Sequence, residues 1–141
     1  MADTPAPVPM SKMLGVIPYV AVNGAAKAME FYQKAFAAEV LAPPMAAPDN
    51  PKLVIHTHLF INGGSIMLSD VFNNDQHSTV MGNNVHLTLV VADGKAWYDR
   101  AVAAGCTVGT PFEQMFWGDK YGQVTDPFGV MWAINQPANQ V

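Results

Sequence analysis

The sequence predicts an α+β fold made of two copies of a βαβββ module within a chain of 141 residues. Three observations support this prediction: a strand followed by a helix occurs twice, each half ends in a strand opened by glycine, and the spacings nearly match. Ile17 and His86 each stand five residues before the end of a first strand, and Gly64 and Gly129 follow them by 47 and 43 residues. The alternative is an unrelated α+β sandwich with coincidental spacing.

The first half can be assigned from its amino end. The β-rich run Val16–Val22 predicts a strand, and Asn23 is a candidate N-cap for a helix whose apolar residues recur at i, i+3 and i+4. Two further strands, Val54–Ile61 and Ser65–Ser69, are separated by Asn62-Gly63-Gly64. An Asn-Gly pair between apolar runs is a strong hairpin signal.

The second half repeats this order. Val85–Val91 predicts a strand, Asp93 can cap the next helix, and Gly105 can end it. Three shorter strands follow, and the turn Asp126–Gly129 sets the register of the last one.

Composition limits the classes of function. With 50% hydrophobic and 13% charged residues, the chain can bury a normal core as one domain. A net charge of −4 with only 7 Lys plus Arg excludes a nucleic-acid partner, and no run of about 20 apolar residues predicts a membrane span. The lone Cys106 cannot form an internal disulfide, so we expect a cytoplasmic protein.

The expected domain organisation follows from the repeat and from the polar segments around it. The segments are a flexible N-terminal tail at 1–13, a single domain at 14–136 with modules at about 14–72 and 84–136, a linker at about 73–83, and a C-terminal tail at 137–141.

Motifs near the carboxyl end indicate a family. The Phe116-Trp117 pair, the Tyr-Gly-x-Val-Thr-Asp sequence from Tyr121 and the Phe-Gly-Val-x-Trp sequence ending at Trp132 resemble the PhnB-like branch of the glyoxalase/bleomycin resistance protein/dihydroxybiphenyl dioxygenase (vicinal oxygen chelate) superfamily. The resemblance covers about residues 14–136 and implies an open, mixed-sheet, barrel-like cleft and a homodimer. It does not fix the reaction, because the superfamily includes isomerases, dioxygenases, thiol transferases and drug-sequestering proteins.

The resemblance also implies where a divalent metal would be bound, on the first and fourth strands of each half. His86 matches one of these positions, whereas Ile17, Leu68 and Ala133 offer no donor at the others. One histidine does not make a stable divalent site. We therefore predict that His86 lines the site without the usual metal centre, and that a divalent metal is possible only with other ligands.

Other polar residues could rebuild a site. His56 and His58 are two residues apart on one strand and share a face, so together with His86 they are the candidate catalytic groups, with Asp70 as a further ligand. In the alternative, these histidines face solvent or are hydrogen-bonded in the core.

Aromatic residues are the candidates for ligand binding. Tyr19 should share the face of Ile17, and Phe116, Trp117 and Tyr121 should cluster at one turn. Such rings suit the wall of a small-molecule site. Phe116 and Trp117 could instead close the core or a dimer contact.

Two functions remain open. The first is a protein that binds a small organic ligand in an aromatic and histidine-lined cleft. The alternative is a metal-dependent or metal-free lyase, isomerase or dioxygenase of glyoxalase type. A methyltransferase is rejected, because Gly63-Gly64 joins two strands and does not form the glycine-rich loop of a parallel doubly wound sheet.

Overall fold

The computed structural model describes residues 7–73, 81–82 and 84–138. The predicted tails and linker therefore lie partly outside the described residues. The elements in chain order are η1 (Met10–Lys12), β1 (Tyr19–Val22), α1 (Ala25–Phe36), β2 (Glu39–Ala47), β3 (Asn50–Ile61), β4 (Gly64–Asp70), β5 (His86–Val90), α2 (Gly94–Ala104), β6 (Thr107–Gln114), β7 (Lys120–Thr125) and β8 (Met131–Gln136).

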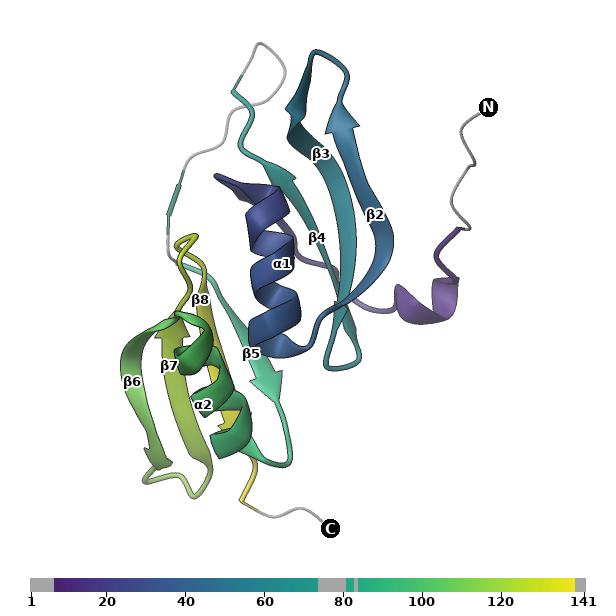
Figure 1. Cartoon of the computed structure of the whole chain (residues 1–141). Helices are drawn as coiled ribbons and strands as arrows, with labels where there is room; N and C mark the ends of the chain where they lie inside the picture. The colour runs from purple at the N-terminus through teal and green to yellow at the C-terminus, as the bar shows by residue number, and fades with distance from the viewer. Residues whose placement is uncertain (1–6, 74–80, 83, 139–141) are drawn as a thin grey trace. The chain divides into compact units, whose positions relative to one another are not determined.

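The described strands form two mixed sheets with the same topology (Figure 1). The first sheet has the order β1-β4-β3-β2 and the second the order β5-β8-β7-β6. In each sheet the module's first strand runs parallel to its last, and the other pairs are antiparallel. This confirms the predicted α+β fold of two βαβββ modules, and neither sheet closes into a barrel.

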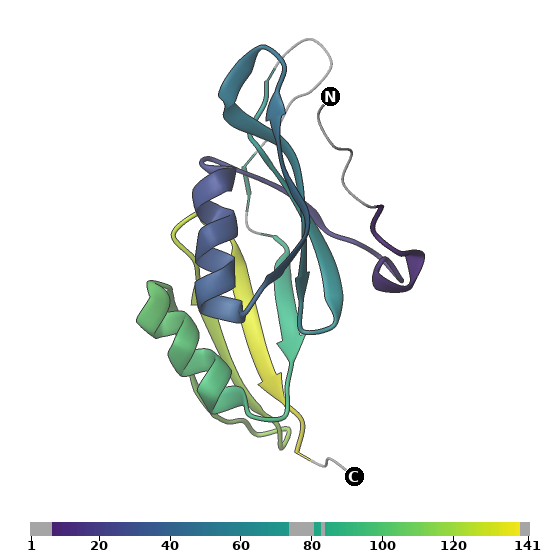
Figure 2. The same ribbon diagram turned by 45° about the vertical axis from the view of Figure 1, so that its right-hand side comes forward.

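The chain divides into two compact units. One comprises Met1–Gln33 with Ala37–Thr79, and the other comprises Lys34–Phe36 with Val80–Val141. In the second unit, α2 packs against β6, β7 and β8, as Figure 2 also shows. Among the described residues, no helix has both the length and the apolar character needed to span a membrane.

The buried face of α1 confirms the helical pattern read from the sequence. Ala28, Tyr32 and Ala35 are fully buried at i, i+4 and i+7. These spacings place the three side chains on one face of a helix, which is the buried face of α1.

The start of α1 differs from the prediction. The residue before the helix is Gly24, in the left-handed region with φ 95°, and the predicted cap Asn23 is not used. The Oδ1 atom of Asp70 accepts hydrogen bonds from Gly24 N (2.9 Å) and Ala25 N (3.0 Å), and Oδ2 accepts one from Val54 N (2.7 Å). A buried carboxylate fits this place because the amino end of a helix carries partial positive charge.

A bulge in β3 changes which side chains share a face. Between His56 and Val54 the pairing advances two residues in β3 but only one in β2, so Ile55 is the extra residue. Val54 is consequently buried like Thr57, whereas Ile55 is 40% exposed. Strict alternation along β3 would place Ile55 on the same face as Thr57, and the bulge interrupts that alternation at this end of the strand.

The hairpin between β3 and β4 forms where it was predicted. Asn62 and Gly63 both have positive φ, at 50° and 82°, and Ile61 pairs with Gly64 across the turn. A two-residue turn with positive φ at both positions matches the right-handed twist of the strands and favours Asn-Gly.

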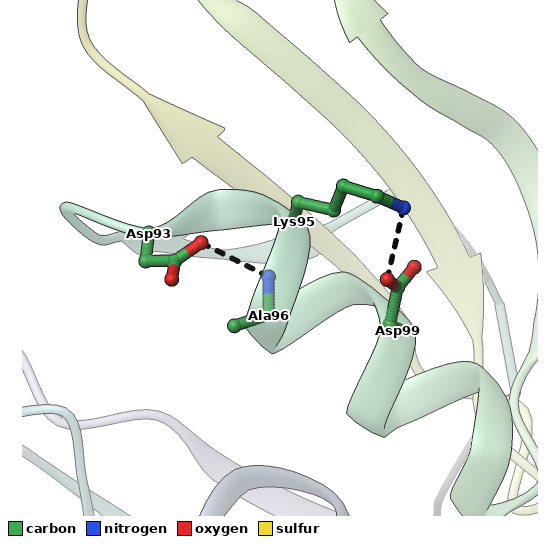
Figure 3. A network of polar contacts seen from close by, with 4 residues as sticks. All are labelled: Asp93, Lys95, Ala96 and Asp99. Carbon is green, nitrogen blue, oxygen red and sulfur yellow. Dashed lines mark hydrogen bonds and ion pairs between the residues drawn. The ribbon is translucent and has the colours of Figure 1, made fainter.

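The second helix is capped as predicted (Figure 3). Asp93 accepts a hydrogen bond from Ala96 N at 3.2 Å, and Gly105 follows the last turn with φ 128°. Lys95 Nζ lies 2.9 Å from Asp99 Oδ2, one helical turn further on. A local side chain therefore caps the amino end of α2, whereas the side chain at the amino end of α1 comes from the distant Asp70.

The turn before β8 is organised by one buried carboxylate. Asp126 Oδ1 accepts hydrogen bonds from Phe128 N (2.8 Å) and Val130 N (3.0 Å), and Oδ2 accepts one from Trp132 Nε1 (2.9 Å). Gly129 supplies the positive φ of 89° that the turn requires. These bonds fix the register of the last strand, as predicted.

Candidate functional site

The two modules can be aligned by the ends of their last strands. Asp70 ends β4 and Gln136 ends β8, and each side chain accepts a hydrogen bond from the amino end of its module's helix. Met67 and Ala133 each lie three residues before these strand ends, so the two positions are equivalent. Each of them also pairs with the first strand of its module. The prediction that matched Leu68 with Ala133 is wrong by one residue, and Leu68 is fully buried.

The residues at the four metal positions do not fit a divalent centre. With this correction, the first unit has Ile17 and Met67 and the second unit has His86 and Ala133. A thioether is a soft donor, which suits Cu(I) better than the divalent ions that carboxylate and imidazole hold. Residues 7–73, 81–82 and 84–138 contain no group of three His, Cys, Asp or Glu side chains that could hold a metal ion.

Tyr19 and His56 are brought together on the first sheet. The Tyr19 hydroxyl donates to the carbonyl of Ile55 at 3.0 Å and lies 3.1 Å from His56 Nδ1, with ring centroids 5.7 Å apart. Because the phenol has one proton, its bond to Ile55 leaves its oxygen as the acceptor for Nδ1–H of the imidazole. His56 Nε2 then has its lone pair available to accept a proton.

His58 occupies a different environment from His56. It is 2% exposed, and its Nε2 lies 2.7 Å from Ser65 Oγ. Ser65 in turn donates to the carbonyl of Lys12, so its oxygen accepts the proton of the imidazole. Burial lowers the pKa of His58, and His56 lowers it further whenever its own imidazole is protonated. A neutral, hydrogen-bonded imidazole that joins β3 and β4 to the η1 turn fits a structural role.

Asp70 and His86 each have contacts of their own within their units. The Asp70 carboxylate is 5% exposed and is occupied by three backbone N–H groups. His86 begins β5 in the second unit, where it pairs with Met131 and is exposed.

A cavity of about 650 Å³ opens on the first unit. Its walls include Tyr19, Ala21, Leu53, Ile55, Ser69 and Phe72, and the β2–β3 turn also contributes to the lining. The bulge in β3 brings Leu53 and Ile55 to this side of the sheet. Of the residues in the cavity's walls, the sequence predicted only Tyr19 as a ligand-binding residue. The bulge that brings the aliphatic side chains to the cavity cannot be recognised from the sequence.

The second unit carries the predicted aromatic cluster. The rings of Phe116 and Trp117 are 4.9 Å apart and nearly perpendicular, and those of Trp117 and Tyr121 are 5.7 Å apart. Gln123 Nε2 donates to the Tyr121 hydroxyl at 2.8 Å. Phe116 is 98% and Trp117 50% exposed, so the pair does not close the core of this chain.

A second cavity, of about 460 Å³, lies at the start of α2. It differs in chemistry from the first, because Asp93, Lys95, Glu113 and Lys120 all contribute to its lining. Both signs of charge are therefore present there.

Comparison with known proteins identifies relatives across most of the chain. The family model described as Glyoxalase/Bleomycin resistance protein/Dioxygenase superfamily matches residues 14–134. The protein Mb0911c of Mycobacterium bovis is 39% identical over 130 residues, which are 88% of this chain and 84% of that protein.

Two solved structures show the same fold. The PhnB protein of Bacillus cereus aligns with a TM-score of 0.70 and 20% identity over 88% of this chain and 100% of that one. TnmS3, an antibiotic binding protein from Streptomyces sp. CB03234, aligns with a TM-score of 0.62 and 23% identity over 86% of this chain and 93% of that one.

Proposed function

Because the chain belongs to the Glyoxalase/Bleomycin resistance protein/Dioxygenase superfamily, we propose that it is a PhnB-like protein that binds a small organic molecule in the cavity of its first unit. The observation that carries this proposal is the cavity of about 650 Å³. Its volume lies within the range of small-molecule sites, and its walls combine apolar side chains with a few polar groups, as such sites usually do.

Tyr19 is the central side chain of the proposed site. It is 53% exposed, so its ring can contact a ligand, while the hydrogen bond from its hydroxyl to the Ile55 carbonyl holds the ring in place. A ring that is already held in place loses less conformational entropy when a ligand binds. The fold shared with an antibiotic binding protein supports a binding role of this kind.

On the second unit we propose a separate surface for ligand contact, made of Phe116, Trp117 and Tyr121. Their edge-to-face packing keeps the rings in order, although two of them are at least half exposed. Exposed, ordered aromatic side chains offer large contact areas at low entropic cost.

A second candidate function is favoured by the contact between Tyr19 and His56. An imidazole with an available Nε2, oriented through Nδ1 by a phenol oxygen, is suited to proton transfer. The corresponding activity is that of a metal-free lyase or isomerase of glyoxalase type. His56→Gln would abolish such turnover but leave binding in the cavity nearly unchanged, which distinguishes the two functions.

The binding proposal predicts that 1-naphthylmethanol, a neutral aromatic probe, binds the first unit with a dissociation constant on the order of 1 mM. Ala21→Leu should weaken this binding at least about tenfold, because the larger side chain occupies ligand volume. The measurement is an NMR titration of backbone amides. Ala26→Leu, the same change at an exposed position of α1, is the control and should bind normally. Equal affinity of the two variants would contradict the proposal.

We also propose that the protein is a homodimer. The end strands of both sheets, which are β1 and β2 in the first and β5 and β6 in the second, offer edges for pairing between chains. The exposed Val90 and Val108 add apolar surface. Light scattering at micromolar concentration should give about twice the 15.2 kDa mass of one chain. A mass that stays at the monomer value across a concentration series would refute the dimer.

A further inference from the structure

The charges around the first-unit cavity have one sign. Among the described residues that line it, the ionisable acids are Asp49 and Asp70, and no Lys or Arg contributes. Lys52 lies on β3 between lining residues but is not itself part of the lining. A ligand in this cavity therefore meets carboxylates and no cation from the described lining.

The two carboxylates do not contribute equally. Asp70 accepts hydrogen bonds from three backbone N–H groups, two of them at the amino end of α1, whose partial positive charge offsets its own. Asp49 is exposed in the β2–β3 turn and contributes to the lining of the cavity. Asp49 is therefore the negative charge that a bound ligand would experience.

The aromatic side chains of the lining, like Asp49, favour a positively charged ligand. The rings of Tyr19 and Phe72 line the cavity, and the face of an aromatic ring attracts cations. Leu53 and Ile55 supply apolar contacts for the uncharged part of a ligand. An anionic ligand would lose its hydration without gaining a positive partner here, which is unfavourable.

From this arrangement we propose that the cavity selects arylalkyl amines in their protonated, cationic form, with the ammonium group near Asp49 and the ring against Tyr19 and the aliphatic wall. This inference rests on the proposed binding function and adds the charge of the ligand to it. The second-unit cavity, which includes Lys95 and Lys120, has no such preference.

The test compares three probes that share one ring system: 1-naphthylmethylamine as the cation, 1-naphthylmethanol as the neutral molecule and 1-naphthylacetate as the anion. We expect the cation to bind the full-length protein about fivefold more tightly than the neutral probe, and the anion to bind most weakly. The preference should diminish in high salt, because the Asp49 contact is exposed and screened.

The variant Asp49→Asn isolates the charge, because asparagine is also well tolerated in turns. It should bring the affinity for the cation to within about twofold of that for the neutral probe and leave the neutral probe unaffected. Glu30→Gln removes the same charge at an exposed position of α1 and should change neither affinity.

The outcomes separate the inference from the function on which it rests. If no probe binds the first unit, the binding function and the inference both fail. If the neutral probe binds as well as the cation, the inference fails and the binding function stands. If the cation is preferred but Asp49→Asn has no effect, or Glu30→Gln has the same effect, the assignment to Asp49 is overturned.

Discussion

Replacing Asp70 with asparagine should lower the free energy of unfolding by about 3 kcal/mol, the largest effect that we expect from an isosteric substitution in this chain. The native carboxylate accepts hydrogen bonds from Gly24 N and Ala25 N through one oxygen and from Val54 N through the other. In asparagine the second oxygen becomes an NH₂ group, which would face the N–H of Val54 across a native distance of 2.7 Å. Two donors then oppose each other in a buried place. Urea denaturation followed by circular dichroism measures the loss.

The second helix provides a matched control for this prediction. Asp93 caps α2 through one hydrogen bond of 3.2 Å from Ala96 N (Figure 3), and its side chain is exposed. Asparagine caps a helix about as well as aspartate, so Asp93→Asn should change the free energy of unfolding by no more than about 0.5 kcal/mol. Similar losses in the two variants would show that the three bonds of Asp70 do not hold the first unit together.

The comparison of these two caps shows which parts of the fold could be predicted from the sequence. Features set by neighbouring residues were predicted correctly: the Asp93 cap, the stop at Gly105, the Asn62-Gly63 turn and the turn at Asp126. Each of these depends on the intrinsic preference of a residue for a local conformation.

Features that depend on distant residues could not be predicted in the same way. Asp70 caps a helix that begins 45 residues earlier in the chain, and no local pattern records that pairing. The bulge at Ile55 depends on pairing with β2, which contains Pro43 and Pro44. Proline is accepted in an end strand such as β2 but disfavours a strand prediction from sequence.

The one-residue error that matched Leu68 with Ala133 arose because glycine positions, and not strand ends, were used to align the modules.

The candidate site could be proposed from the sequence only in part. Position and residue type indicated Tyr19 and the cluster of Phe116, Trp117 and Tyr121 as candidate ligand contacts, and these assignments stay predictions. His58 shows where such reasoning stops, because a polar residue in a strand looks the same in sequence whether it contacts a ligand or makes a structural hydrogen bond. Only the contacts of the folded chain separate those two uses.

The single cysteine should be almost inert in the folded protein. Cys106 is 6% exposed, and burial, followed by the negative charge of Asp126, raises the pKa of its thiol to about 12. An exposed cysteine with a pKa of about 8.5 is roughly one quarter thiolate at pH 8, whereas a thiol with the raised pKa is thiolate in only about one molecule in 10⁴. Alkylation by iodoacetamide at pH 8 should therefore be about 10³-fold slower in the native protein than in the protein in urea. Comparable rates in the two states would show that the thiol is accessible.

The same raised pKa makes stability depend on pH in one direction. Between about pH 8.5 and 12, the folded state keeps the proton of Cys106 while the unfolded state loses it. The contribution of this group to the free energy of unfolding is therefore fully present below this window and is lost as the pH rises through it. From pH 8 to pH 10 the free energy of unfolding should decrease by about 2 kcal/mol on this account. Burial, and then the charge of Asp99, also raise the pKa of Tyr98, but its unfolded-state pKa of about 10 puts its effect mostly above pH 10. Cys106→Ala should therefore abolish most of the loss between pH 8 and pH 10, measured by urea denaturation at both values. If the variant loses as much stability as the native chain over this interval, another group is responsible for the alkaline destabilisation.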